Sequence, residues 1–307
     1  MKLNPVISPP SRSASASDHF VVCTRYLAGS LVTGILADVQ LQFPADADEA
    51  TADLPVLVYR CSPALETLLA EIVSMPPDDR QIDSEHGAEY QFWLVRDPEL
   101  ASSLQSALDD VDAFYWTDGW TESLDQPVSY TDHESFSAAL LLSEDQLQPR
   151  ARHRLLADLG GMEAEEFLQR LQKCFNIRVA ANAEDAVPQQ SREMGLYVDG
   201  AWYKLRLIEG TWFSEDPVRD MDISILAENI FELTLGIGQP ETNARIAVAD
   251  PVMSPQQLAE LVDQDEWQAV FVLYPPSVEL LMDLSDAGRL PPPHSVEFGQ
   301  PLPWMTP

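Results

Sequence analysis

"MGLYVDGAWYKLRL", residues 194–207, predicts a β-hairpin and with it the class of the fold. Apolar and aromatic side chains stand on both sides of Asp199-Gly200, a dipeptide typical of two-residue turns because both residues tolerate positive φ. Two strands joined by so short a turn run antiparallel. We therefore expect antiparallel pairing in the sheet to which these residues belong.

Helical and strand patterns alternate irregularly on either side of this hairpin. Apolar spacing predicts helices over 63–73, 98–111, 163–175, 222–236, 254–264 and 277–288. Asp97 and Ser254 are typical caps for two of them, and Gly288 is typical of a helix end. Strand patterns occupy 31–43, 55–60, 89–95 and 268–274, and a short buried segment occupies 136–142. The chain is thus predicted to be an α/β (α+β) protein with a mixed, largely antiparallel sheet and flanking helices.

Acidity is the strongest feature of the composition. The 307 residues include 50 Asp and Glu against 18 Lys and Arg, a net charge of −32. Such a charge repels phosphate backbones, so we expect no nucleic-acid partner. The acids are spread along the chain, which favours a solvated acidic surface; the alternative is a surface that mimics nucleic acid or docks a basic partner.

The remaining composition is typical of a folded cytoplasmic protein without a membrane anchor. Hydrophobic residues make up 45%, and the length suits one large or two medium domains. No stretch is apolar for long enough to span a membrane, and residues 1–18 form a polar lead, expected to be flexible, without the apolar core of a signal peptide. Cys23, Cys61 and Cys174 are far apart, so neither a disulfide framework nor a metal site is predicted.

Four blocks together resemble a known bacterial family. They are residues 149–177, 195–207, 221–248 and 265–295. In sequence and in order they resemble the domain-of-unknown-function 1015 (DUF1015) family, over roughly residues 20 to 300. The resemblance implies a divergent, N-terminally shortened member whose family-like region is 19–307, with subdomains at 19–155 and 156–307.

The family's signature is Ala-Asp-Gly-His-His-Arg, and "FYWTDGWTES", residues 114–123, stands in its place. That signature is similar to the nucleotide-phosphate loop of ParB-like and sulfiredoxin-like proteins and of the related free-serine kinases. The resemblance therefore implies a ParB/sulfiredoxin-like element around residues 90–155 that binds a nucleotide. A Gly lets the backbone approach phosphate, and His and Arg supply donors and positive charge.

This chain departs from the signature at its working side chains. Asp118 and Gly119 match, but Trp120 and Thr121 stand at the two His positions and Glu122 stands at the Arg position. At an effective dielectric of 20, two unit charges 4 Å apart interact by about 4 kcal/mol, so replacing Arg with Glu turns an attraction for phosphate into a comparable repulsion. We expect a degenerate loop and assign no catalytic residue. The rings of Trp116 and Trp120 would then fill a vacated ligand pocket or present an aromatic surface to a partner.

A second departure lies near the C-terminus, in "PPHSVEF", residues 292–298. The family pattern there is Pro-Pro-Lys-Ser-Thr-x-Phe. Ser295 matches, whereas His294 takes the place of the Lys and Glu297 adds an acid. A weaker family pattern, His-Glu-x-Thr, would fall on residues 48–51, where the His is replaced by Asp48. Each departure removes a cation or a His.

One basic cluster remains in "PRARHR", residues 149–154, and its last two residues match the family. Its members are Arg150, Arg152, His153 and Arg154. They are either a structural cluster that ties acidic loops together or, with His294 and Ser295, a residual site for a phosphate or carboxylate.

Three functions follow as hypotheses. The first is a non-catalytic family member without a cofactor, which acts as a binding or accessory subunit for a protein partner or a full-length paralogue. The second is a nucleotide-dependent kinase that uses ATP or ADP with Mg²⁺ on a small hydroxyl compound such as free serine. The third is an acidic nucleic-acid mimic or decoy.

Overall fold

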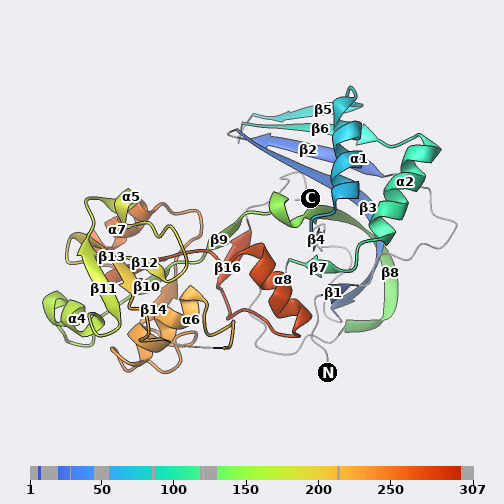
Figure 1. The fold of residues 1–307 in the computed structure, drawn as a ribbon. Coiled ribbons are helices and arrows are strands. Elements are labelled where there is room, and N and C mark those ends of the chain that lie inside the picture. The colour runs from blue at the N-terminus through green and yellow to red at the C-terminus, as the bar shows by residue number, and fades with distance from the viewer. Residues whose placement is uncertain are drawn as a thin grey trace. The chain divides into compact units, whose positions relative to one another are not determined.

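The computed structural model describes most of the chain as two compact units. It describes residues 6–7, 20–27, 29–44, 55–84, 87–117, 120, 130–212 and 215–298. Unit 1 comprises Met1–Gln148, Ser285–Arg289 and Phe298–Pro307, and unit 2 comprises Pro149–Leu284 and Leu290–Glu297. Figure 1 shows the elements of both units.

Unit 1 contains an eight-stranded sheet with the order β1-β7-β4-β8-β3-β2-β6-β5. Its strands are β1 (Val6–Ile7), β2 (Val21–Leu27), β3 (Ser30–Pro44), β4 (Val56–Tyr59), β5 (Asp79–Asp83), β6 (Ala88–Leu94), β7 (Phe114–Trp116) and β8 (Tyr130–Ser143). Neighbouring strands run antiparallel except β4 and β8, which run parallel. The predicted mixed, largely antiparallel sheet is confirmed.

Two helices, α1 (Pro63–Ser74) and α2 (Pro98–Asp109), pack together and supply the helical side of the unit 1 core. Apolar side chains from both helices pack against strands β2, β3, β4, β6 and β8. The predicted cap of α2 is confirmed, because the Asp97 side chain accepts a hydrogen bond from the Glu99 N–H at 2.9 Å. The 3₁₀ turn η1 (Glu144–Gln146) follows β8.

Unit 2 contains a six-stranded sheet with the order β11-β13-β12-β15-β10-β14, in which all neighbours run antiparallel. Its strands are β10 (Arg154–Leu156), β11 (Phe175–Val179), β12 (Glu193–Val198), β13 (Ala201–Leu207), β14 (Ile246–Val248) and β15 (Ala269–Leu273). A two-stranded sheet joins β9 (Pro149–Ala151) and β16 (Val296–Phe298). The predicted hairpin is confirmed: Asp199 and Gly200 connect β12 to β13 with φ of 50° and 71°.

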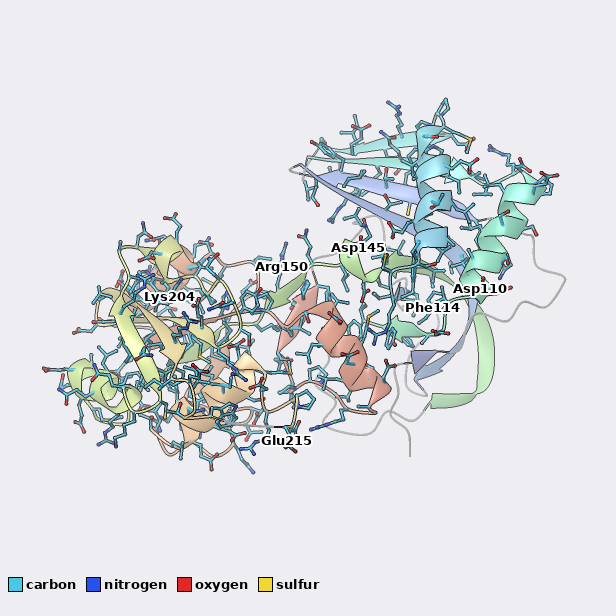
Figure 2. The ribbon with its side chains drawn as sticks, viewed as in Figure 1. Asp110, Phe114, Asp145, Arg150, Lys204 and Glu215 are labelled. Atoms are coloured by element: carbon cyan, nitrogen blue, oxygen red, sulfur yellow. The ribbon has the colours of Figure 1, made fainter. Side chains whose placement is uncertain are left out.

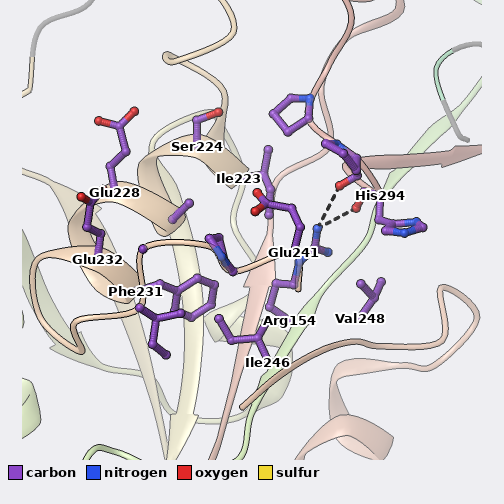
Figure 3. A pocket seen from close by; sticks show the side chains of 16 residues that line it. Arg154, Ile223, Ser224, Glu228, Phe231, Glu232, Glu241, Ile246, Val248 and His294 are labelled. Atoms are coloured by element: carbon purple, nitrogen blue, oxygen red, sulfur yellow. Dashed lines mark hydrogen bonds between the residues drawn. The ribbon is translucent and has the colours of Figure 1, made fainter. Parts of the chain in front are cut away.

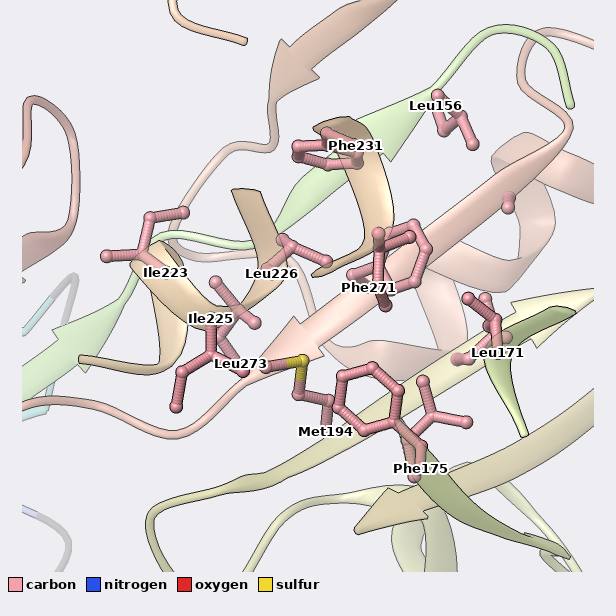
Figure 4. Packing of buried hydrophobic residues seen from close by; sticks show 14 of the residues in the cluster. Leu156, Leu171, Phe175, Met194, Ile223, Ile225, Leu226, Phe231, Phe271 and Leu273 are labelled. Carbon is pink, nitrogen blue, oxygen red and sulfur yellow. The ribbon is translucent and has the colours of Figure 1, made fainter. Parts of the chain in front are cut away.

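The helices of unit 2 are α4 (Ala164–Leu171), α5 (Ala183–Ala186), α6 (Asp222–Leu226) and α7 (Pro255–Asp263), and α6 continues into the π-helical turn η2 (Ala227–Glu232). Helix α8 (Val278–Asp286) belongs to unit 2 up to Leu284, and its last two residues belong to unit 1. Figure 4 shows the packing of α6 and η2 against the strands. There the rings of Phe231 and Phe271 meet edge to face, with centroids 5.8 Å apart. Ser254 begins α7 with a capping box, as predicted.

Several predicted elements were wrong in extent. The helix over 163–175 ends at Leu171, because Phe175 pairs with Leu207 as the first residue of β11. The helix over 222–236 is α-helical only to Leu226. The segment 136–142 is part of the longer strand β8, and strand β5 carries no alternating apolar pattern that could have predicted it.

Other expectations concern termini, membranes and cysteines. Val6 and Ile7 pair with β7, while the rest of the lead 1–18 and residues 48–51 lie outside the described residues. Among the helices that the structure describes, none has the length and apolarity required to cross a membrane. The three cysteines are free thiols, and burial raises the pKa of the Cys23 thiol to about 12.

Candidate functional site

Trp120, at the first His position of the signature, is part of the interior of unit 1. The residue is 1% exposed and is among the largest fully buried side chains. Its indole N–H donates to the Ser285 hydroxyl at 2.8 Å, and its ring lies 6.2 Å from that of Tyr115 and 5.9 Å from that of Phe298. A buried Trp with a satisfied N–H gains both apolar burial and ring contacts. Its side chain is therefore a packing element, and the expectation of an aromatic surface offered to a partner is wrong for Trp120.

The strand before Trp120 is fixed by the same interior. Phe114 and Tyr115 of β7 are 1% and 2% exposed, and Phe114 is labelled in Figure 2. The Tyr115 hydroxyl donates to Asp286 Oδ1 at 2.9 Å, and Arg60 donates to Asp286 Oδ2 at 2.9 Å. Burial, and next the hydrogen bond to Asp286, raises the pKa of Tyr115, so the phenol stays protonated at neutral pH.

The rest of the signature loop is not described. Asp118, Gly119, Thr121 and Glu122 lie outside the described residues. Within the described part, the backbone N–H of Trp120 donates to the Thr117 carbonyl at 2.9 Å.

Arg154, in unit 2, is the most buried residue of the basic cluster, with 6% exposure. Its guanidinium donates to the carbonyls of Arg152 at 2.7 Å and of His294 at 2.9 Å. Burial, and next the charge of Arg152, lowers the pKa of Arg154 to about 10, so the side chain remains protonated at neutral pH. A protonated guanidinium thus ties β10 to the 293–294 segment, as in the structural alternative considered above.

The other members of the basic cluster form hydrogen bonds or an ion pair, or are exposed. His153 Nδ1 accepts the Leu273 N–H at 3.2 Å, and burial lowers the pKa of His153 to about 4, so its imidazole is neutral at pH 7. The Arg152 guanidinium lies 3.5 Å from the Glu297 carboxylate, and the Arg152 backbone N–H donates to the Ser295 carbonyl at 3.5 Å. Arg150 is exposed on β9 (Figure 2). The structure therefore brings Arg152, Arg154 and the segment 294–295 together and leaves Arg150 apart.

A cavity of about 260 Å³ opens beside Arg154 (Figure 3). Arg154 and His294 line one side, and Glu228 and Glu232 of η2 line the other. Glu241 also lines it, so three carboxylates accompany one guanidinium among the described lining residues. The apolar part of the wall comes from α6, η2 and the β14 region: Ile223, Phe231, Ile237, Ile246 and Val248. The Glu228 carboxylate is paired with Arg219, and the carboxylates of Glu232 and Glu241 disfavour an anion with several charges in this cavity.

The π-helical turn shapes this wall. The Leu233 N–H donates to the Glu228 carbonyl five residues earlier, and the buried Asn229 amide donates to the Ile225 carbonyl at 3.0 Å. A side-chain donor inserted into the helical ladder supports the wider turn, and π-turns occur frequently at functional sites. The sequence analysis missed Glu228 and Glu232, although their spacing of four residues is typical of one helix face. Among the described residues, no three His, Cys, Asp or Glu side chains are grouped so that they could hold a metal ion.

Comparison with known proteins gives one family and a set of distant structures. The model of the family described as "Protein of unknown function (DUF1015)" matches residues 47–224. No curated protein matches the chain. A free serine kinase solved with AMP is 12% identical, with a TM-score of 0.34, and the match covers 84% of this chain and 92% of that one. A variant of that kinase with AMP is 11% identical (TM-score 0.35; 85% and 95% covered), and a conserved hypothetical protein from Pyrococcus furiosus is 10% identical (TM-score 0.33; 84% and 93% covered).

Proposed function

The chain belongs to the DUF1015 family of proteins of unknown function, and on this premise we propose that it is a non-catalytic member that acts as a binding or accessory protein. The observation that carries the proposal is the burial of Trp120. A phosphate loop must expose backbone N–H groups and cationic side chains to its ligand. Here a signature position holds an indole that is 1% exposed and hydrogen-bonded to Ser285.

The basic cluster supports the same proposal. The Arg154 guanidinium donates hydrogen bonds to the main-chain carbonyls of Arg152 and His294, and the Arg152 side chain lies beside Glu297. The Arg154 guanidinium shares its cavity with three Glu residues. A nucleotide phosphate placed there would meet repulsion from the carboxylates, whereas the net charge of −32 suits a basic protein partner. A full-length paralogue is the other candidate partner.

Nucleotide binding is the test, because the family signature that residues 114–123 replace is similar to a nucleotide-phosphate loop. We expect calorimetric titration of the full chain with AMP, ADP and ATP, each with Mg²⁺, to give no saturable heat. The combined change Trp120→His, Thr121→His and Glu122→Arg restores the donors of the family signature and should raise nucleotide affinity above that of the wild type. Glu209→Arg, at an exposed position of unit 2, is the matched charge control, since it changes the net charge by the same two units. Saturable micromolar binding by the wild type, with phosphoryl transfer to a small hydroxyl compound, would contradict the proposal.

A further inference from the structure

Unit 2 contains a second cavity, of about 160 Å³, whose lining combines apolar side chains with hydroxyl and carboxyl groups. Asp220 and Asp222 line it at the start of α6, and Ser191 lines it before β12. Ser277 before α8 and Ser295 before β16 complete the polar lining. No Lys, Arg or His is among its lining residues. The volume is about five times the roughly 30 Å³ that a water molecule occupies in the liquid, enough for a molecule of a few heavy atoms.

The buried hydroxyl group of Ser295 indicates a ligand. The residue is 3% exposed, and its Oγ has no hydrogen-bond partner among the described residues. Buried hydroxyl groups in folded proteins almost always have a partner, in the protein or in a bound molecule. The unpaired hydroxyl therefore marks a position in this cavity where a polar group of a ligand would be satisfied.

Asp222 supplies the charge of the cavity. It is 7% exposed, and its Oδ1 accepts the Arg192 N–H at 2.6 Å. Burial raises the pKa of Asp222 to about 7, against the opposing hydrogen bonds from Arg192 and Ser191. The Arg192 guanidinium donates to both carboxylate oxygens of Asp220, each at 2.8 Å. The nearest arginine is thus paired with the other carboxylate.

We propose that this cavity binds a small primary amine in its ammonium form, with N–H groups that donate to the Asp222 carboxylate and the Ser295 hydroxyl. An ammonium group offers three donors and a positive charge, which match the Asp222 carboxylate and the hydroxyl groups of the lining, while the apolar side chains suit a short alkyl chain. An anion or the carboxylate of a zwitterion would meet Asp220 and Asp222 without a lining cation. A quaternary ammonium ion would have no N–H for Ser295. The inference concerns unit 2 and does not depend on the proposed function.

The test is calorimetric titration of the full chain at pH 8 with ethylammonium and ethanolamine. We expect saturable binding of both, at least tenfold tighter than that of the neutral ethylene glycol. Glycine and tetramethylammonium should bind at least tenfold more weakly than ethanolamine. Affinity for ethanolamine should fall as the pH drops below 7, because the Asp222 carboxyl then takes up a proton; Asp220, Arg192 and Ser191 are the charged and polar groups that face it.

Three variants locate the site. Asp222→Asn keeps the shape and an acceptor for the Arg192 N–H but removes the charge, and we expect at least a tenfold loss of ethanolamine affinity. Ser295→Ala removes one buried oxygen and should weaken binding several-fold. Glu232→Gln, in the lining of the larger cavity, is the matched control and should leave the affinity unchanged. Circular dichroism shows whether each variant folds. If Asp222→Asn does not fold, Ser295→Ala alone tests the location of the site.

The inference is overturned if neither amine binds saturably to the wild type. It is equally overturned if both folded variants of the small cavity bind ethanolamine as the wild type does, or if Glu232→Gln weakens binding as much as they do. These outcomes are separate from those of the nucleotide titration, which tests Trp120 in unit 1.

Discussion

The signature region of unit 1 and the cavity region of unit 2 differ in what they bury. Around Trp120 the buried groups are rings, together with a hydroxyl that satisfies the indole N–H. In unit 2 a guanidinium and a carboxyl group, those of Arg154 and Asp222, are buried beside cavities. Burying a ring stabilises a fold, whereas burying a charge costs free energy unless it is fully paired. Arrangements that cost stability are frequent at functional sites, so unit 2 is where binding should be sought.

The largest expected effect is that of Trp120→Ala in unit 1. We expect the free energy of unfolding to fall by about 3–5 kcal/mol, because the change leaves a cavity among Tyr115 and Phe298 and removes the indole N–H that donates to Ser285. Urea denaturation followed by fluorescence measures the loss. Ile82→Ala is the control: Ile82 is 78% exposed, and its change should stay within about 0.5 kcal/mol. A loss of less than about 1 kcal/mol for Trp120→Ala would mean that the indole does not support the interior of unit 1.

The second test removes the hydrogen bonds that the Arg154 guanidinium donates in unit 2. Arg154→Met keeps an unbranched apolar stem but leaves the carbonyls of Arg152 and His294 without their donor. We expect a loss of about 3 kcal/mol in the free energy of unfolding, since hydrogen bonds from charged donors contribute about 1.5–3 kcal/mol each. The measurement is urea denaturation at pH 7.

Arg150→Met is the matched control, because Arg150 is exposed on the neighbouring strand β9. Its change should lie within about 0.5 kcal/mol. If Arg154→Met were as stable as the wild type while a phosphate or carboxylate ligand lost its binding, the guanidinium would be a ligand group and the anion-site alternative would stand.

Local chemistry made part of the fold predictable. The turn at Asp199-Gly200 and the caps at Asp97 and Ser254 act within a few residues, so the sequence alone identifies them. The end of α4 was not predictable in this way. Phe175 lies on the apolar face of the predicted helix, but pairing with β13 draws it into β11. Tertiary pairing overrides local periodicity there.

The candidate sites show the same limit. The sequence identified Trp120 as a departure from the family signature but left open whether its ring is buried, since burial depends on Ser285 and Phe298, far away in the chain. Asp222 carries no sequence signal beyond its place at the start of a helix. Its pKa results from burial, which only the packing of the folded chain produces. Ser295 was identified by resemblance alone, as an anion ligand.

The smallest expected effect is a pH dependence of the free energy of unfolding, which arises from Asp222 in unit 2. The pKa of Asp222 is about 7 in the folded chain and 3.8 without burial, so between these values the folded state binds more protons than the unfolded state. Stability from this group is therefore fully present below about pH 4 and is lost as the pH rises towards 7. The linkage relation gives a loss of about 2 kcal/mol between pH 5 and pH 7.

The Asp222→Asn variant should lack this contribution. In urea denaturation, its stability relative to the wild type should therefore rise by about that amount over the same interval. Asp265→Asn, an exposed carboxylate outside the cavity whose positive φ Asn tolerates, should keep the wild-type pH dependence. Parallel pH curves for the wild type and Asp222→Asn would mean that the Asp222 carboxyl is solvated, and the contrast between the two units would then rest on Arg154 alone.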